Sequence, residues 1–229
     1  MLSERFADRK SAGIRLAEAV AALMREHPSL NDPVLLALPR GGVPVALEIA
    51  RALGSPLDLV MVRKIGVPWQ PELAAAAVVD GDAPELVVNR EVVAMAGMSQ
   101  ADLEAAERRE LAEIDRRLGL YLGTRSPVPI EGRDAIVIDD GIATGATTRA
   151  ALRGVRRRRP RSLTLAVPVA PPETIERLAT EVDHVICLAT PTPFFAIGSH
   201  YADFRQVSDD EVVRMLREAE GFVASDKAP

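Results

Sequence analysis

The residues with the clearest chemical potential are two adjacent acids, Asp139 and Asp140, which directly follow the apolar run 135–138. The run predicts a buried strand, and the stretch 141–147 predicts a turn that opens into a helix. Backbone N–H groups in such a turn, together with the start of the helix, form a concavity suited to phosphate. Ionised carboxylates only accept hydrogen bonds, so two of them beside an anion site favour a ligand that also carries neutral hydroxyl groups, such as a ribose diol.

The stretch after the acids supplies the small residues and hydroxyl groups that a phosphate loop needs. Small residues let the backbone approach a ligand closely, and threonine hydroxyls add donors. The candidate residues are Gly141, Ala143, Thr144, Gly145, Ala146 and Thr147. An ordinary turn followed by a helix start explains the two acids alone equally well, but it does not explain the whole string. Neither the P-loop pattern nor the Gly-x-Gly-x-x-Gly pattern of dinucleotide-binding folds is present in the sequence.

The string from Ile138 to Thr147 resembles the signature with which type I phosphoribosyltransferases bind 5-phosphoribosyl-1-diphosphate (PRPP). The resemblance implies that Asp139 and Asp140 bind the 2- and 3-hydroxyls of the ribose, while the following loop holds the 5-phosphate. It implies a nitrogenous base as the acceptor and Mg²⁺ as the cofactor, held mainly through PRPP rather than by a set of protein ligands.

A second segment agrees with this resemblance, because residues 39–42 follow a predicted strand where the family places its diphosphate loop. Arg40 would donate to diphosphate oxygens, and Gly41 and Gly42 would free backbone amides to approach them. Family members often hold a non-proline cis peptide at this place. Taken alone, the segment would be an ordinary strand-to-helix turn.

Basic residues and a proline-containing loop follow the second predicted strand. Arg63 and Lys64 end that strand, where the family commonly places a basic residue beside the diphosphate, although an isolated pair of this kind is more often surface charge. With Arg40, Lys64 is the candidate for stabilising the leaving diphosphate. Residues Ile65 to Glu72 are predicted to form a loop that would cover the site and exclude water, with Trp69 either in the lid or anchoring it by packing.

Aromatic residues gather near the end of the chain, at Phe194, Phe195, Tyr201 and Phe204. In the family a variable hood lies over the sheet and selects the base, often with an aromatic ring stacked on it. Residues 189–229, with part of the N-terminal segment, are predicted to form this hood. Phe194 or Phe195 would then face the base, and closing the end of the core is the alternative for either ring.

The order of predicted elements indicates the α/β class. Helices are predicted at Ser3–Glu26, Val43–Leu53, Ser99–Leu122 and Pro172–Ala179, with a further helix after the loop that ends near Arg158, and strands are predicted at Val34–Leu38, Leu57–Val62, Leu73–Val79, residues 135–138, Leu163–Val169 and His184–Leu188. The alternation predicts a Rossmann-like, mostly parallel sheet with helices on both faces, as in the type I phosphoribosyltransferase fold. Residues 1–229 are predicted to form a single phosphoribosyltransferase-like domain with the helix 99–122 inserted.

The composition of the chain bears on its partners, on membrane association and on its cellular compartment. The net charge of −5 argues against a nucleic-acid partner, and the basic run Arg156–Arg161 is most simply a solvated helix end. No apolar stretch is long enough to span a membrane. The single cysteine, Cys187, allows no internal disulfide, which fits the cytoplasm. The resemblance further predicts a homodimer, with the helix 99–122 as a possible contributor.

The predicted activity is transfer of a phosphoribosyl group to a base, as in nucleotide salvage. Family members that use 6-oxopurines usually place an acid where this chain has Ala143, so hypoxanthine and guanine are disfavoured. Adenine-like, pyrimidine and other acceptors stay open, and no general base is identified. The main alternative is a PRPP-sensing regulator with the same fold and no transferase activity. An enzyme related to PRPP synthesis is a third possibility.

Overall fold

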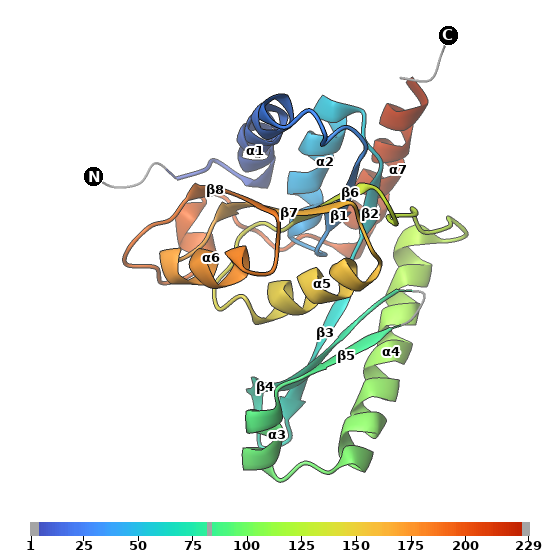
Figure 1. The fold of residues 1–229 in the computed structure, drawn as a ribbon, viewed down its shortest axis with the longest axis vertical. Helices are drawn as coiled ribbons and strands as arrows, with labels where there is room; N and C mark the ends of the chain where they lie inside the picture. The colour runs from blue at the N-terminus through green and yellow to red at the C-terminus, as the bar shows by residue number, and fades with distance from the viewer. Residues whose placement is uncertain (1–4, 82–83, 226–229) are drawn as a thin grey trace.

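Five parallel strands form the sheet at the centre of the molecule, in the order β2-β1-β6-β7-β8 (Figure 1). The computed structural model describes residues 5–81 and 84–225. The strands are β1 (Pro33–Ala37), β2 (Leu57–Leu59), β6 (Asp134–Ile138), β7 (Ser162–Val169) and β8 (His184–Ala189). Every residue of β6 and β7 is buried, because helices cover both faces of the sheet. The predicted α/β class with a mostly parallel sheet is confirmed.

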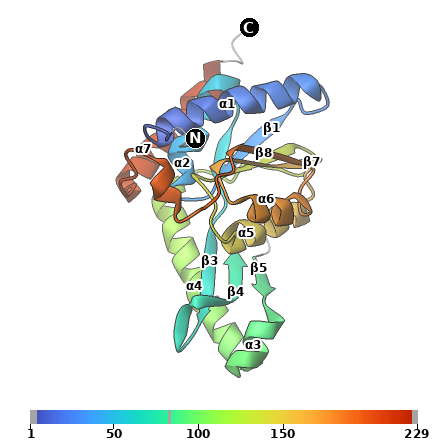
Figure 2. The same cartoon turned by 90° about the vertical axis from the view of Figure 1, so that its left-hand side faces the viewer.

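Helices form one layer on each face of this sheet (Figure 2). One layer contains α1 (Arg9–Glu26), α2 (Gly42–Leu53) and α7 (Asp209–Ser225), and the other contains α5 (Ala146–Arg157) and α6 (Pro172–Ala179). Side chains alternate between the two layers along each strand. Leu35 of β1 therefore packs with residues of α1 and α2, whereas the next residue, Leu36, packs with residues of α5.

A second sheet extends away from the main body, below it in the view of Figure 1. Its strands pair antiparallel in the order β3-β4-β5. They are β3 (Val62–Val67), β4 (Gln70–Val79) and β5 (Glu85–Val88), and two helices lie beside them, α3 (Arg90–Ala96) and α4 (Gln100–Leu122). We call these five elements the arm. It carries Lys64, one of the predicted site residues.

Several predictions within the arm were wrong. The single strand predicted for Leu57–Val62 is divided between β2 and β3, because the chain passes there from the main sheet into the arm. The loop predicted from Ile65 to Glu72 is a β-hairpin with a turn at residues 68–69, in which register shifts beside Gly66 accommodate the irregular pairing. The strand predicted from Leu73 begins at Gln70 and belongs to this antiparallel sheet rather than to the parallel one. Neither β5 nor α3 was predicted, because both are short and contain no fully buried residue.

The helix α1 begins at Arg9, later than the predicted start at Ser3, which lies outside the described residues. The Asp8 carboxylate caps the helix by accepting the Ser11 N–H at 2.7 Å. Just before this cap, Phe6 bridges to Tyr201, with the Phe6 N–H donating to the His200 carbonyl at 2.9 Å. The segment before α1 is thereby joined to the segment after β8.

The helix α4 starts at a capping box, in which the side chains of Ser99 and Asp102 each accept a hydrogen bond from the other residue's N–H. Its buried residues include Ile114 and Tyr121, which pack in the same core as α2 and α7. Among the described residues, no helix combines the length and the apolar character that crossing a bilayer requires.

Asp80 stands where the arm meets the main body, and its backbone and side chain both bond to Met61. Its N–H donates to the Met61 carbonyl at 3.0 Å, and its carboxylate accepts the Met61 N–H at 2.8 Å. Burial raises the pKa of Asp80 from 3.8 to about 7, against the opposing effects of the Met61 N–H and the nearby charge of Arg158. As pH rises from the ordinary pKa towards the raised one, the unfolded chain loses a proton that the folded chain keeps. Rising pH through this range therefore lowers stability.

We expect Asp80→Asn to raise the free energy of unfolding at pH 8 by on the order of 2 kcal/mol relative to the unmodified chain, because the amide keeps an acceptor for Met61 without a buried charge. The gain should shrink towards pH 4, close to the ordinary pKa of 3.8, because the folded carboxyl is protonated there and the unfolded one partly protonated. Urea unfolding between pH 4 and pH 8 measures this difference. The exposed Asp115 provides the matched control, Asp115→Asn. A gain from Asp80→Asn that is equal at both ends of the range would contradict the assignment.

Candidate functional site

The pairing of β1 with β6 brings the two predicted binding segments together. Ala37 pairs with Ile138 at the carboxyl ends of these strands, and the Leu38 N–H donates to the Ile138 carbonyl at 2.9 Å. Residues 39–42 and the acid pair therefore leave the same edge of the sheet side by side. The Pro39–Arg40 peptide bond is cis, as the resemblance implied.

Gly41 and Gly42 allow this close approach. A Cβ on Gly41 would lie 2.0 Å from Asp140 Oδ2, and one on Gly42 would lie 2.6 Å from the Ile138 carbonyl oxygen. Both distances are far shorter than a nonbonded contact permits. The glycines are thus required by the packing of the loop against the acids, whatever ligand the loop binds.

The side chain of Asp140 is buried and paired with Arg9. Arg9 Nε donates to Asp140 Oδ2 at 2.7 Å, and the same guanidinium lies over the ring of Phe204, 3.9 Å from its centroid. The Tyr201 hydroxyl donates to the Asp140 carbonyl oxygen at 2.5 Å. Burial raises the pKa of Asp140, although the charge of Arg9 and its hydrogen bond oppose the rise.

Asp139 is partly exposed, and its Oδ1 accepts the N–H of Asp140 at 2.8 Å. Desolvation by its surroundings raises the pKa of Asp139 well above its ordinary value, and the adjacent charge of Asp140 adds to the rise. A carboxyl group that is costly to ionise alone is favourably placed to meet a hydroxyl donor or a cation.

The loop after the acids is anchored through its carbonyl groups. Thr174 Oγ1 of α6 donates to the Ala143 carbonyl at 2.9 Å, and Arg177 donates to the Thr144 carbonyl at 3.4 Å. Gly145 caps α5 with φ of 78°, a left-handed conformation that favours glycine. The predicted phosphate-contacting residues Ala143, Thr144, Ala146 and Thr147 are exposed, whereas Gly141 and Gly145 are buried.

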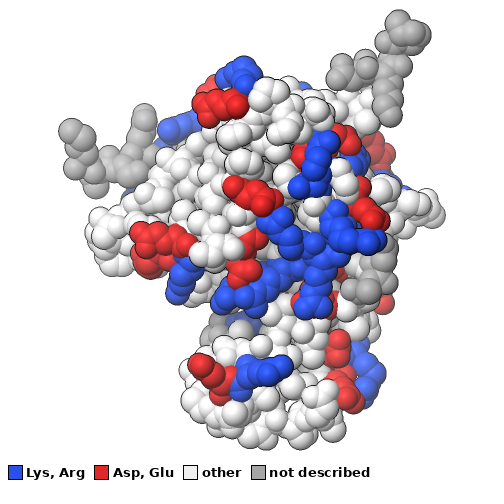
Figure 3. All heavy atoms as spheres, viewed as in Figure 1, with Lys and Arg blue, Asp and Glu red and all other residues white. Residues whose placement is uncertain are grey.

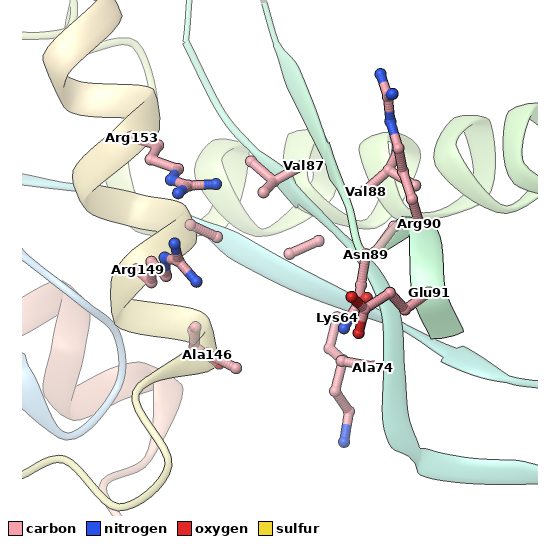
Figure 4. A pocket seen from close by; sticks show the side chains of 14 residues that line it. Lys64, Ala74, Val87, Val88, Asn89, Arg90, Glu91, Ala146, Arg149 and Arg153 are labelled. Atoms are coloured by element: carbon pink, nitrogen blue, oxygen red, sulfur yellow. The ribbon is translucent and has the colours of Figure 1, made fainter. Parts of the chain in front are cut away.

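A groove of about 550 Å³ lies between α5 and the arm (Figure 4). Its floor is apolar and includes Ala76, Ala77 and Val87, while four basic residues lie along it. The basic residues are Lys64, Arg90, Arg149 and Arg153. The groove reaches the loop at Ala146 and Thr147, so three predicted site residues line one cavity. Arg149 and Arg153 also pair with Glu181.

The predicted diphosphate-binding residues Arg40 and Arg63 do not line this groove and form ion pairs elsewhere. Arg40 Nη1 lies 3.4 Å from Asp209 Oδ1, which also accepts the Tyr121 hydroxyl at 2.6 Å. Successive residues of a strand face opposite sides, and Arg63 accordingly turns away from the groove and donates to Glu110 of α4 at 2.9 Å.

The aromatic candidates differ in exposure. Phe194 is half-buried and stacks on His200 with centroids 5.1 Å apart. Phe195 is 83% exposed, so it does not close the core. Trp69, in the hairpin turn, is 63% exposed and is not a packing anchor within this chain.

Basic side chains gather across the middle of the face shown in Figure 3. The run 156–161 carries five arginines. Four of them are paired with acids: Arg156 with Asp183, Arg157 with Glu85, Arg159 with Glu131 and Arg161 with Asp134. These ion pairs offset the local charge. The run thus forms salt bridges on the protein's own surface, in agreement with the solvated helix end that the sequence suggests.

The parallel sheet and the loop after β6 are those expected of a phosphoribosyltransferase-like domain, and comparison with known proteins identifies the same family. The chain belongs to the phosphoribosyl transferase domain family, whose family model matches residues 5–203. Two Mycobacterium tuberculosis proteins, MT0597 of strain CDC 1551 and Rv0571c of strain H37Rv, are each 46% identical to it over 214 residues. Both carry phosphoribosyl transferase as a provisional name. The match covers 93% of this chain and 47% of each relative, so the chain spans about half their length.

A solved structure shares the fold over nearly its whole length. The protein TT1426 from Thermus thermophilus is 43% identical to this chain, and the two superimpose with a TM-score of 0.79. The match covers 93% of this chain and 98% of that one. The arm and the main body together thus correspond to an arrangement already seen in a crystal.

Sequence reasoning missed the partners of the acid pair. Arg9, Tyr201 and Thr174 all contact the predicted binding segments, yet Arg9 is 131 positions from Asp140 and Tyr201 is 61 positions from it. The aromatic cluster at the end of the chain was the one signal that pointed towards Tyr201. Within the described residues, no group of three or more His, Cys, Asp or Glu side chains is arranged to hold a metal ion.

We expect Gly41→Ala to lower the free energy of unfolding by about 1–3 kcal/mol, because the new methyl group would collide with the buried carboxylate of Asp140. Denaturant unfolding measures the loss. The matched control is Gly119→Ala in α4, where an added Cβ meets nothing within 4 Å and should stabilise the helix by about 0.5–1 kcal/mol. Equal stability of the two variants would show that Gly41 does not constrain Asp140.

Proposed function

We propose that this chain transfers the 5-phosphoribosyl group of PRPP to a nitrogenous base and releases diphosphate. The observation that carries the proposal is the convergence of the acid pair, the exposed threonine loop and the glycine loop at one edge of the sheet. Parallel α/β sheets bind ligands at the carboxyl ends of their strands, where all three segments lie. Membership of the phosphoribosyl transferase domain family supports the same reaction class.

The acid pair would bind the ribose of PRPP, and the loop would bind its 5-phosphate. The exposed hydroxyls of Thr144 and Thr147 are available to phosphate oxygens, and the N-terminus of α5 favours negative charge beside them. The carbonyl groups of Ala143 and Thr144 accept hydrogen bonds from α6, which leaves the amides of the loop to face a ligand. Gly141, Gly145 and Ala146 let the backbone come close.

The leaving diphosphate would be stabilised by Arg40 and Lys64, with the amide of Gly41 beside them, whereas the Gly42 N–H already donates to the Leu38 carbonyl at 3.0 Å. Arg40 is half-buried at the loop, with its guanidinium near Asp209, and Lys64 is exposed along the groove. Arg63 contributes through its ion pair with Glu110, which fixes the strand that carries Lys64.

Catalysis in this scheme comes from positioning and electrostatics rather than from a covalent nucleophile. The bond between C1 of the ribose and the diphosphate oxygen breaks as the base nitrogen approaches, and the sugar passes through an oxocarbenium-like state. Mg²⁺ prefers oxygen ligands and often binds through substrate phosphates and one or two carboxylates, which the partly exposed Asp139 fits. When bound, the ion would neutralise charge on the leaving diphosphate.

The acceptor is restricted by the residues around the loop. Ala143 offers no carboxylate to a 6-oxopurine, which favours an adenine-like, pyrimidine or other base. Phe194 and Phe195 lie in the segment after β8 and are the candidates for stacking on it. We place the enzyme in the cytoplasm as a homodimer, with α4 as a possible contributor to the interface.

The test incubates the protein with PRPP, Mg²⁺ and a panel of bases and follows diphosphate release. We expect release with one class of base. Asp139→Asn combined with Asp140→Asn should abolish PRPP binding in calorimetry, because both carboxylate acceptors are lost.

The control removes two exposed acids of α4 instead, with Glu104→Gln and Asp115→Asn, and changes the net charge equally. This control should bind PRPP normally. Unchanged affinity in the Asp139/Asp140 variant would refute the role of the acid pair. PRPP binding without diphosphate release for any base would instead favour a PRPP-sensing regulator.

A further inference from the structure

Arg40, the arginine of the loop 39–42, contacts an acid that no motif in the sequence marks. We propose that this acid, Asp209 at the start of α7, is a positioning residue. It orients Arg40 towards the leaving diphosphate and joins Arg40 to α4, the long helix of the arm. The inference rests on the proposed function and adds to it a residue that needs no contact with the substrate.

One carboxylate oxygen of Asp209 joins two elements of the fold. Its Oδ1 accepts the Tyr121 hydroxyl at 2.6 Å and lies 3.4 Å from Arg40 Nη1. Tyr121 lies in the last turn of α4 and is only 4% exposed, so its hydroxyl is a fixed donor. The tyrosine therefore places the acid, and the acid in turn places the arginine.

The start of α7, which carries Asp209, is itself fixed. The Ser208 N–H donates to the Glu211 carboxylate at 2.9 Å, and the Glu211 N–H donates to Ser208 Oγ at 3.2 Å. Val212 of the same helix is buried in the core that also contains Tyr121. There α7 packs against α4 (Figure 2). The Asp209 carboxylate thus extends from a helix that is held at its first turn.

The charge of Asp209 suits an anchor for a guanidinium. The hydrogen bond from Tyr121 keeps the pKa of Asp209 below its ordinary value, against desolvation by the surroundings, and the charges of Arg40 and Arg117 add to the lowering. Arg117 donates to the Glu113 carboxylate at 2.6 Å and so has an acid of its own. Asp209 is therefore ionised at neutral pH, the state in which it attracts Arg40.

Arg40 keeps donors for a ligand while it contacts Asp209. A guanidinium has five N–H donors on three nitrogens, and this contact engages one nitrogen. A long side chain loses rotamer freedom when it binds a ligand, so a contact that already restricts it lowers the cost of binding diphosphate. The Arg40 and Asp209 side chains are 28% and 45% exposed, so the contribution of the pair is modest.

The same contacts connect the loop 39–42 to the arm. Lys64, the other residue proposed to stabilise the diphosphate, lies on β3, which packs against α4. The neighbouring Arg63 donates to Glu110 of α4 at 2.9 Å. Both cations are therefore positioned relative to one helix, Lys64 through β3 and Arg40 through Asp209.

The test measures the affinities of PRPP, inorganic diphosphate and ribose 5-phosphate by calorimetry, with Mg²⁺ present. Asp209→Ala should weaken the binding of PRPP and of diphosphate about fivefold, the upper range for an exposed ion pair, because Arg40 is no longer oriented. Ribose 5-phosphate lacks the diphosphate, so its affinity should be unchanged. With diphosphate release as the readout, the KM for PRPP should rise more than kcat falls.

Asp210→Ala is the matched control, because Asp210 is the next residue in the same turn of α7 and is exposed. It removes the same charge from the same helix end. The control therefore measures the long-range effect of a lost acid on anion binding, and all three affinities should be unchanged in it.

Tyr121→Phe tests the link to the arm. It keeps the buried ring and removes only the hydroxyl, so it should weaken diphosphate binding about threefold. In the Asp209→Ala background it should cause no further loss. Asp209→Ala should likewise cause no further loss in an Arg40→Ala background, because the three residues act in series.

Several results would overturn the assignment. An equal loss for ribose 5-phosphate would give Asp209 a general structural role, and an equal loss in Asp210→Ala would assign the effect to net charge. A gain in diphosphate affinity in Asp209→Ala would show that Asp209 draws Arg40 away from the ligand. PRPP binding that Asp209→Ala leaves unchanged would refute this inference alone, whereas absence of PRPP binding by the unmodified protein would refute the proposed function as well.

Discussion

The parallel pairing of β1 with β6 is the constraint on which the candidate site depends. Ala37 pairs with Ile138, so residues 39–42 and the acid pair leave the carboxyl ends of adjacent strands at the same register. At that spacing a side chain on Gly41 would occupy the position of the Asp140 carboxylate. The backbone at residue 41 can lie against the buried Asp140 carboxylate only because glycine has no side chain.

The main sheet was predictable because its signals are local. The largely apolar runs of β6 and β7 and the glycine at the end of α2 indicate the strands and the end of the helix without information from elsewhere in the chain. The arm was not predictable in the same way. The strand β5 is short and has no buried residue, the hairpin contains Gly66 and Pro68, and the sheet packs against α4 through tertiary contacts. The glycine and prolines of the segment Ile65–Glu72 therefore led to the prediction of a loop, whereas pairing between β3 and β4 makes the segment a hairpin.

Within the site, the sequence identified the binding segments but not the state of each residue. The residue types from Asp139 to Thr147 are enough to predict a binding site for a sugar phosphate. The ion-pair partner of Asp140, however, comes from α1, and that of Arg63 comes from α4. Contacts between residues so far apart along the chain cannot be predicted from the spacing of residues in the sequence. For the same reason, two adjacent aspartates that are identical in sequence differ in burial and in pairing.

The contacts of Arg9 link the acid pair to both ends of the fold. Phe6 bridges to Tyr201, the Tyr201 hydroxyl bonds to Asp140, and Arg9 spans from Asp140 to the Arg205 carbonyl. Residues before α1 and residues after β8 must therefore both be docked before Asp140 is held. Because a buried carboxylate without its partner is strongly destabilising, the geometry of the strand end and the closure of the segment after β8 form together.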